Sequence, residues 1–236
     1  MKRAIAILGL STLFGLTTGC SDPAADAPKA TVGSAKPVPS AAKPATSAKP
    51  ATSAAATATA TATAAAAPEA PAGAVKLEPG DNKIEFVGAK VTGSHEGKFE
   101  KFSGWVAVEG DKPETSKLFI EIQMDSVKTD DAKLDGHLKN KDFFEVETYP
   151  KATFTSTEIK AGGANGATHT ITGNLNLHGV EKSISFPATI KIEKDKVTGK
   201  AEFAINRKDF NINYAGQADN LIKDDVLIKL TIDAKR

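Results

Sequence analysis

The feature that most restricts the fold of this chain is a regular alternation of apolar and polar residues through most of residues 75–236. Successive side chains of a β-strand point to opposite faces, so an alternation with period two predicts half-buried strands. In one such run, Ile184 and Phe186 alternate with Ser183 and Ser185. Turn-forming segments rich in glycine or charged residues separate the runs. We therefore predict eight strands, near residues 82–92, 98–109, 117–125, 151–159, 168–177, 182–192, 197–205 and 225–234.

One segment departs from this alternation. Residues 130–144 place Leu134 and Leu138 on one side of a helical spacing, which predicts a short helix. Eight antiparallel strands that share one apolar face must cover that face, and closing the sheet into a barrel also removes its exposed edges. We therefore predict an all-β fold, an eight-stranded antiparallel barrel with one short helix. A barrel of this size is filled by side chains or holds one small ligand.

The chain before the barrel has a different composition. Residues 21–74 are rich in Ala, Pro and Thr and contain no aromatic residue, Leu, Ile or Met. Such a segment cannot bury enough apolar surface to offset the entropy cost of ordering it. We expect residues 20–74 to form a disordered linker and residues 75–236 to form one folded domain.

Residues 1–19 have the features of a secretory signal peptide. Lys2 and Arg3 give a positive start, and residues 4–16 form an apolar stretch of 13 residues. That stretch is shorter than the roughly 20 residues that a membrane-spanning helix needs. Its length and flanks instead fit a signal peptide that is removed during export.

The end of this segment resembles a bacterial lipobox, in which a cysteine is lipidated and becomes the mature N-terminus. Small residues precede Cys20, although Thr17 stands where such a motif usually has Leu. Ser21 after the cysteine is typical of sorting to the outer membrane. We therefore predict lipidation at Cys20 and a periplasmic location, anchored to the outer membrane. The alternative is an ordinary signal peptide that contains a cysteine.

Several classes of function find no support in the sequence. A single cysteine excludes an intrachain disulfide framework and a Cys-cluster metal site, and the four histidines lack the close spacing typical of zinc ligands. No nucleophile elbow, phosphate-binding loop or dinucleotide-binding motif is present. The net charge of +1 argues against a nucleic-acid-binding domain. We predict a binding protein rather than an enzyme, with no metal and no cofactor.

Five motifs then occur in a fixed order through the predicted barrel. They are GKFEKFSG at 97–104, DSVKT at 125–129, HLKNKDFF with YPKATF between 137 and 154, GNLNLHGV at 173–180 and RKDF at 207–210. Together they resemble the YceI-like family of periplasmic, lipocalin-like barrels. The sequence departs from the family pattern at Asn140, where Ser is common, and at Asn211, where Gly is usual. Asn tolerates a left-handed backbone better than most residues, so the turn at Asn211 is expected to persist.

The resemblance implies an eight-stranded, lipocalin-like barrel that binds an amphiphile with a long isoprenoid tail, such as a polyisoprenoid quinone. We expect inward-facing apolar residues to line the tail, while each of them would serve equally as plain core. This predicted ligand-binding set is Phe86, Phe99, Trp105, Ile120, Ile122, Phe154, Leu175, Leu177, Phe186, Ile190, Phe203 and Ile205. The alternative function is a barrel filled by side chains that acts as an interaction scaffold in the envelope. A homodimer is compatible with either function.

Polar residues within the motifs allow a structural and a functional interpretation. His137 and His178 are expected to be structural hydrogen-bonding residues near turns, with a headgroup donor, metal ligand or catalytic base as the alternative. Arg207 and Asp209 are expected to pair across a turn, with anchoring of a headgroup as the alternative.

Overall fold

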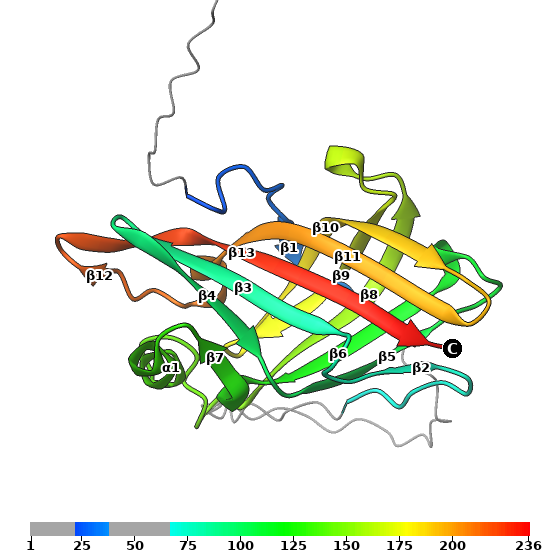
Figure 1. Cartoon of the computed structure of the whole chain (residues 1–236), viewed down its shortest axis with the longest axis horizontal. Coiled ribbons are helices and arrows are strands. Elements are labelled where there is room, and N and C mark those ends of the chain that lie inside the picture. The colour runs from blue at the N-terminus through cyan, green and yellow to red at the C-terminus, as the bar shows by residue number, and fades with distance from the viewer. Residues whose placement is uncertain (1–21, 38–66) are drawn as a thin grey trace, which may run out of the picture.

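The computed structural model describes residues 22–37 and 67–236. The predicted signal peptide and Cys20 lie outside the described residues, as does most of the predicted linker. The folded part is a curled antiparallel sheet of thirteen strands with one α-helix (Figure 1). The predicted all-β class with a single short helix is therefore confirmed.

The strands run in chain order from the N-terminal segment to the end of the chain. They are β1 (Thr31–Ser34), β2 (Val75–Leu77), β3 (Lys83–Lys90), β4 (Gly93–Phe99), β5 (Phe102–Ala107), β6 (Lys117–Gln123), β7 (Val127–Thr129), β8 (Lys151–Ala161), β9 (His169–Leu177), β10 (Val180–Ile192), β11 (Lys196–Asn206), β12 (Gly216–Gln217) and β13 (Asn220–Lys235). The α-helix is α1 (Ala132–Lys139), and four short 3-10 helices are Pro113–Thr115, Met124–Ser126, Ala164–Gly166 and Arg207–Phe210.

Two interrupted strands close the sheet into a barrel. β4 and β5 are separated only by Glu100 and Lys101, and β6 and β7 only by a 3-10 turn. At the interruption, the Glu100 N–H donates to the Ser126 carbonyl (3.1 Å) and the Gln123 N–H donates to the Lys101 carbonyl (3.0 Å). Counted as single strands, β4/β5 and β6/β7 complete a circuit of eight with β3, β8, β9, β10, β11 and β13. These eight correspond to the eight predicted strands.

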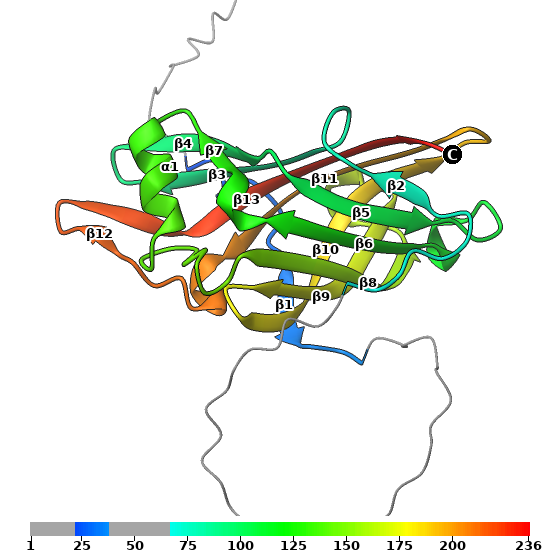
Figure 2. The ribbon, with the colours of Figure 1, turned by 90° about the horizontal axis from the view of Figure 1, so that it is seen from below.

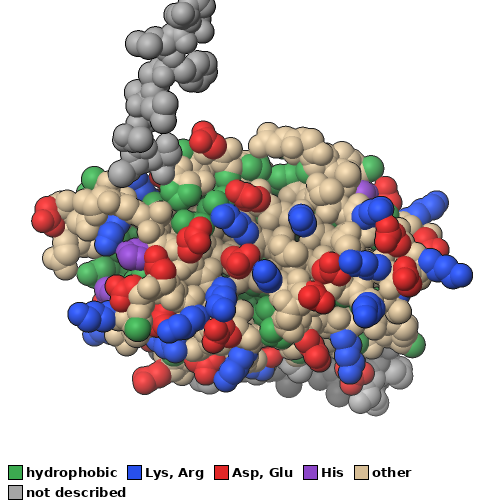
Figure 3. Space-filling view, viewed as in Figure 1, with side chains coloured by type: hydrophobic (Ala, Val, Ile, Leu, Met, Phe, Trp, Pro, Cys, Tyr) green, Lys and Arg blue, Asp and Glu red, His purple; other side chains and the backbone are tan. Residues whose placement is uncertain are grey.

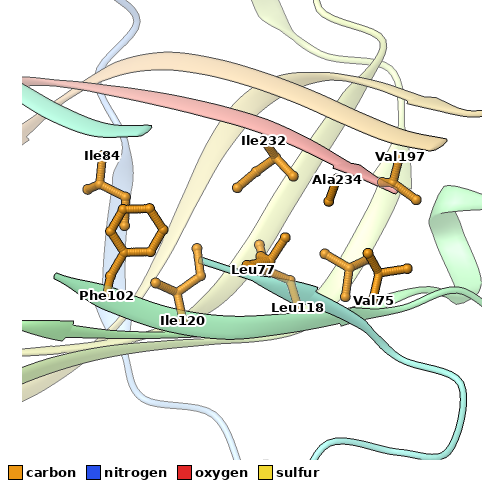
Figure 4. Packing of buried hydrophobic residues seen from close by; sticks show 10 residues of the cluster. Val75, Leu77, Ile84, Phe102, Leu118, Ile120, Val197, Ile232 and Ala234 are labelled. Carbon is orange, nitrogen blue, oxygen red and sulfur yellow. The ribbon is translucent and has the colours of Figure 1, made fainter. Parts of the chain in front are cut away.

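One end of the barrel is packed solid. β2 pairs with β5 and places Val75 and the fully buried Leu77 between the two sides of the barrel. Figure 4 shows these side chains in one cluster with those of Phe102, Leu118 and Ile232. The burial of this cluster stabilises the barrel by roughly 25 cal/mol for each Å² of apolar surface removed from water. The opposite end, which α1 covers, is built differently (Figure 2).

The N-terminal segment differs from the sequence-based expectation. The composition predicts a disordered linker that includes residues 22–37, yet β1 pairs with β10 over four residue pairs, from Thr31–Ser185 to Ser34–Lys182. β10 pairs with β11 only over 189–192, so its earlier residues would otherwise leave backbone groups without partners. Satisfying those groups favours the added strand. The expectation of a disordered linker is therefore wrong for this segment.

Charged side chains of both signs share the face of the molecule drawn in Figure 3. Lys and Arg side chains are interspersed with Asp and Glu over the face drawn in Figure 3. This distribution agrees with the near-neutral net charge of the chain. Within the described ranges, no helix has the length and apolar character required to cross a membrane.

Gly173 provides a test of the packing inside the barrel. A Cβ atom at this position would lie 2.4 Å from the Phe154 ring and 2.5 Å from the Thr155 carbonyl oxygen. We expect Gly173→Ala to lower the free energy of unfolding by about 1–3 kcal/mol, because the backbone must move to accept the methyl group. Urea unfolding followed by the fluorescence of Trp105, the only tryptophan of the chain, measures this change.

The control is Gly88→Ala in β3. A Cβ atom there meets nothing within 4 Å, and the residue has no positive φ. We expect Gly88→Ala to change the free energy of unfolding by less than about 1 kcal/mol. Equal effects of the two substitutions would contradict the assigned packing around Gly173.

Candidate functional site

The barrel contains an apolar cavity of about 190 Å³ in the half that β2 does not fill. Its wall comes from all eight barrel strands, from α1 and from the segments that follow α1 and β11. Ten residues of the predicted ligand-binding set line it: Phe86, Phe99, Ile120, Ile122, Phe154, Leu175, Leu177, Phe186, Phe203 and Ile205. Their location at a cavity agrees with the prediction, and their contact with a ligand stays a prediction.

Two members of the predicted set lie elsewhere. Trp105 is on the outer face of β5, where its indole N–H donates to the Pro68 carbonyl (3.2 Å) and its ring packs beside Phe119. The strand is interrupted after Phe99, and the alternation of inward and outward side chains starts afresh in β5. Phe102 therefore points inward and Trp105 points outward. The prediction that Trp105 lines the cavity is therefore wrong.

Ile190 is the second exception. It borders a separate hollow of about 60 Å³ towards the packed end, together with Ile159, Ile171 and Ile192. β10 is long enough to pass both halves of the barrel, so its inward residues Phe186 and Ile190 face different compartments. The period-two pattern predicts the face of a residue but not its depth along the barrel.

Several inward-facing apolar residues are only half-buried. Phe154, Leu175, Leu177, Val226 and Ile228 all line the cavity, and each retains some solvent exposure. Leu77 at the packed end is fully buried by comparison. Contact between apolar surface and water is unfavourable, so an apolar molecule that covered these side chains would gain free energy relative to water.

Aromatic rings form much of the cavity wall. Phe186 and Phe203 stack with their ring centroids 4.1 Å apart, and Phe154 lies 5.6 Å from Phe186. Towards α1, Phe99 lies between Phe86 at 5.6 Å and Phe144 at 6.0 Å. Large, rigid rings of this kind offer much apolar contact area at a low entropy cost.

Sequence reasoning missed other parts of the wall. The β13 residues Val226, Ile228 and Leu230 line the cavity, although their alternation was sufficient to identify them as inward-facing. Ile212 and Phe144 lie in segments without regular strand or α-helical structure. No periodic pattern marks such positions, so only the fold reveals their contribution.

Arg207 is the buried charge at the edge of the cavity. Its guanidinium donates to the carbonyls of Ile212 (2.7 Å), Lys223 (3.0 Å) and Ile222 (3.4 Å), and it lies 3.3 Å from a carboxylate oxygen of Asp224. Burial lowers the pKa of Arg207, and the charge of Asp224 partly opposes this effect. Arg207 therefore ties the segment after β11 to the start of β13.

This geometry corrects one prediction and supports another. Arg207 pairs with Asp224, whereas Asp209 lies 3.5 Å from the Lys182 ammonium group, so the predicted Arg207–Asp209 pair is wrong. The structural role predicted for Arg207 agrees with its hydrogen bonds to backbone carbonyls. Asn211 has φ of 60°, as expected for a residue that replaces glycine at a left-handed turn.

The two motif histidines lie in separate polar clusters. The His137 Nε2 atom is 3.1 Å from a carboxylate oxygen of Asp142, and the His137 ring packs edge-on against Phe143 and Tyr214. The arrangement agrees with the structural role predicted for His137.

His178 has φ of 52° in the turn between β9 and β10. Its Nδ1 atom lies 3.2 Å from the Phe210 carbonyl oxygen, and its Nε2 atom lies 3.6 Å from Glu145. Its ring packs edge-on against Tyr149. Among the residues that the structure describes, no group of three or more His, Cys, Asp or Glu side chains has the geometry to hold a metal ion.

A polar anchor fixes α1 over the cavity. Asp135 accepts hydrogen bonds from the Lys128 ammonium group (2.6 Å) and from the Thr129 N–H (2.6 Å) and hydroxyl (2.7 Å). The bond from Lys128, followed by those from Thr129, lowers the pKa of Asp135 to about 2. Because Leu138 on the same helix lines the cavity, this anchor positions part of the cavity wall.

Comparison with known proteins identifies relatives of this barrel. The model of the YceI-like domain family matches residues 76–234. A UPF0312 protein of Pectobacterium atrosepticum is 38% identical over 122 residues, which cover 49% of this chain and 62% of that protein. The chain thus spans less than two thirds of this relative. A UPF0312 protein of Pseudomonas putida strain W619 is 34% identical over 139 residues, covering 56% of this chain and 71% of that protein.

Solved structures share the fold. Burkholderia cenocepacia BcnA has a TM-score of 0.58 and 27% identity, with 65% of this chain and 96% of that chain covered. A Campylobacter jejuni YCEI protein has a TM-score of 0.53 and 27% identity, covering 59% and 84% of the two chains. A polyisoprenoid binding domain from Saccharophagus degradans has a TM-score of 0.54, covering 69% of this chain and 98% of that chain. At 17% identity, it shows the fold alone.

The anchor of α1 predicts a specific acid sensitivity. The pKa of Asp135 is about 2 in the folded chain, below the ordinary value of about 3.9 for an aspartate. The carboxylate therefore stabilises the folded state fully above about pH 4, and this contribution is lost as the pH falls towards 2. We expect Asp135→Asn to be less stable than the native chain at pH 6, with the difference shrinking by pH 2. Urea unfolding at several pH values tests this, and a difference independent of pH would contradict it.

The hydrogen bonds of Arg207 predict a strong effect of a conservative change. We expect Arg207→Lys to lower the free energy of unfolding by about 2 kcal/mol or more, because a lysine cannot donate to three carbonyls held in this geometry. The control is Lys208→Ala, which removes a more exposed partner of the same Asp224 carboxylate. We expect that change to cost less than about 1 kcal/mol in urea unfolding. Equal losses would contradict the role assigned to Arg207.

Proposed function

This chain belongs to the YceI-like domain family, and from that premise we propose that its barrel binds an amphiphile with a long apolar tail, of the polyisoprenoid class. The observation that carries the proposal is the apolar cavity, in whose wall several inward-facing side chains are only half-buried. A fold neighbour described as a polyisoprenoid binding domain supports the choice of ligand class. A quinone-like headgroup is the form of this ligand that we propose to test first.

The size of the cavity sets a condition on binding. Its volume of about 190 Å³ lies below the roughly 300–1,000 Å³ of typical small-molecule pockets. A long tail therefore needs the cavity to widen. We propose that widening occurs at the α1 end, where polar anchors such as Asp135 and Arg207 hold the wall. The packed cluster around Leu77 keeps the other end closed.

The membrane origin of such a ligand decides which contacts give selectivity. Transfer of an apolar tail from lipid to an apolar cavity exchanges one apolar environment for another, so its net free energy is small. Contacts of the headgroup at the α1 end must then set the preference for one amphiphile over another. Arg207 and Lys223 border the cavity and are the charged donors nearest to such a headgroup.

We further propose that the protein works in the periplasm, attached to the outer membrane through lipid on Cys20, and holds or shuttles its ligand. The predicted signal peptide and the position of the single cysteine support this location. Stable attachment takes more than one acyl chain. We propose binding without catalysis, because the motif histidines occupy structural clusters with aromatic and acidic neighbours.

The alternative of an interaction scaffold makes a different prediction for the interior. A scaffold needs no cavity, and its barrel would be filled along its whole length as it is around Leu77. The hollow bordered by Phe154 and Leu175 favours the binding function. Homodimerisation remains compatible with the binding function and is tested by the mass measurement below.

Native mass spectrometry tests the proposed ligand directly. The full chain with Cys20→Ser, incubated with phosphatidylcholine vesicles that contain a polyprenyl quinone, is expected to acquire one adduct with the mass of that quinone. Organic extraction of the purified complex then identifies the adduct. A chain that keeps its unliganded mass under these conditions would favour the scaffold function.

A cavity-filling substitution tests where the ligand lies. We expect Leu175→Trp to reduce quinone loading by about tenfold or more, because the larger ring occupies space that the tail requires. The control is Ile190→Trp, which adds the same ring at an inward-facing position outside the cavity. We expect the control to retain loading, and circular dichroism checks that both variants fold. Retained loading in a folded Leu175→Trp variant would contradict the proposed site.

A further inference from the structure

The barrel has a gap between β10 before residue 189 and β11 beyond residue 200, which we call the seam. Another segment of the chain fills it. β10 pairs directly with β11 only between residues 189–192 and 197–200, and the two strands part towards residue 182 of β10. Residues 28–34 lie in this gap (Figure 1), where β1 pairs with β10 and the Ala30 N–H donates to the Ala204 carbonyl of β11 (2.8 Å). The Ala204 N–H donates in turn to the Pro28 carbonyl (3.0 Å). The segment thus contacts both sides of the seam through its backbone.

Asn174 of β9 holds the end of the same segment. Its side-chain amide donates to the Lys36 carbonyl (2.6 Å), and its side-chain carbonyl accepts from the Lys36 N–H (2.9 Å). Both bonds are made to the backbone of Lys36, so they do not depend on its side chain. An ion pair of 2.6 Å between Lys29 and Asp225 is the charged contact at the other end.

Side chains contribute little to this attachment. Thr31, Gly33 and Ser34 are exposed, and only Ala30 and Val32 pack in part against the barrel core. Ala24, just before the seam, is the one deeply buried side chain of the segment and covers Val87 on the outer face. A strand held mainly by backbone hydrogen bonds, with little buried apolar surface, belongs to the less stable parts of a protein.

The barrel is complete without the segment. The circuit of eight strands closes through β10 and β11 at residues 189–192, and β1 lies outside that circuit. The part of the chain shared with the YceI-like family begins at residue 76, well after the segment ends. Loss of β1 therefore leaves every pair of the eight-stranded circuit in place.

We propose that the seam between β10 and β11 is a strand-binding site, and that residues 22–36 are a releasable segment, held at the seam by residues 28–36, that switches the chain between a short and a long tether. The occupant is the chain's own N-terminal segment, bound by addition of a strand to a sheet edge. Its covalent connection through residues 38–66 gives it a high effective concentration at the seam. A second copy of the chain is the competing occupant.

The consequence for tether length rests on the proposed lipid attachment at Cys20. In the docked state only three residues lie between Cys20 and the buried Ala24, a reach of about 13 Å. In the released state the barrel is connected from Val75, and the unfolded linker that the composition predicts would have a mean span of roughly 40 Å. Docking therefore holds the barrel at the attachment point, and release lets it move away.

Hydrogen exchange of the full chain with Cys20→Ser tests release without any ligand, so its outcome is independent of the proposed lipid binding. We expect amides 29–36 to exchange about tenfold or more faster than those of β9, because they open locally while the barrel stays folded. Asn174→Ala is expected to accelerate exchange in 29–36 further and to leave β8 and β13 unchanged. Exchange of 29–36 only at the rate of the barrel strands, in both chains, would overturn the proposal.

A disulfide lock provides a second, reversible test. Ser34 and Lys182 are paired residues of β1 and β10, and Cys20→Ser leaves no other cysteine in the chain. Oxidised Ser34→Cys/Lys182→Cys is expected to slow exchange in 29–36 to that of β9, and reduction is expected to restore it. The control pair Ser34→Cys/Lys229→Cys joins positions that are not partners and is expected to stay reduced. Disulfide-linked dimers of the first pair that increase with protein concentration would assign the seam to a second copy and overturn the switch within one chain.

Discussion

Complete pairing of backbone groups around a closed, strongly curved sheet is the constraint on which the rest of this structure depends. A buried N–H or C=O group without a partner costs roughly 1–3 kcal/mol, so a gap between diverging strands must be filled or exposed to water. The barrel has two such gaps, one beside β5 and one beside β10. In each, a short strand from the chain before residue 83 supplies the missing partners. β2 fills the first gap and β1 fills the second, although the two strands differ greatly in what else they bury.

The difference between these two strands divides the molecule into fixed and adjustable parts. Val75 and Leu77 of β2 alternate inward and are buried in a large apolar cluster, so this strand forms part of the core. β1 offers mainly exposed, small or polar side chains and adds hydrogen bonds with little apolar burial. The cavity lies away from the packed end, and its far wall combines a smaller buried apolar cluster, which includes Leu138 and Ile212, with hydrogen bonds of Asp135 and Arg207. Polar anchors can break and re-form singly, whereas opening the cluster around Leu77 would expose many apolar side chains to water at once.

The sequence predicted the barrel strands well because alternation directly records which face of a strand is buried. It identified ten of the cavity-lining residues for the same reason. It placed Trp105 on the wrong face because residues 100–101 interrupt the strand, so that the alternation in β5 does not continue that of β4. The β1 segment was missed because its pairing uses backbone groups, which every residue has, and because its composition resembles that of a disordered linker. The Arg207–Asp224 pair was missed because the two residues meet only when the segment between β11 and β13 folds back. The face on which a strand residue lies can be predicted from its neighbours in sequence. A contact between segments that a loop brings together can be identified only from the folded structure.

The proposed ligand links the cavity with the N-terminal segment. If the tail moves between lipid and barrel with little change in free energy, the affinity of the barrel for membrane-borne ligand is modest, and the amount bound depends on how often the α1 end meets a membrane. A tether sets that frequency, because it fixes the local concentration of the barrel near the surface to which it is attached. A strand held by a few backbone hydrogen bonds is well suited to change such a concentration, since its release alters tether length while the eight-stranded circuit stays paired. Val32 pairs with Ile184 of the cavity wall, and Ala30 and Val32 pack against the cluster that contains Phe186, so docking of the strand and filling of the cavity act on the same part of β10 from its two sides.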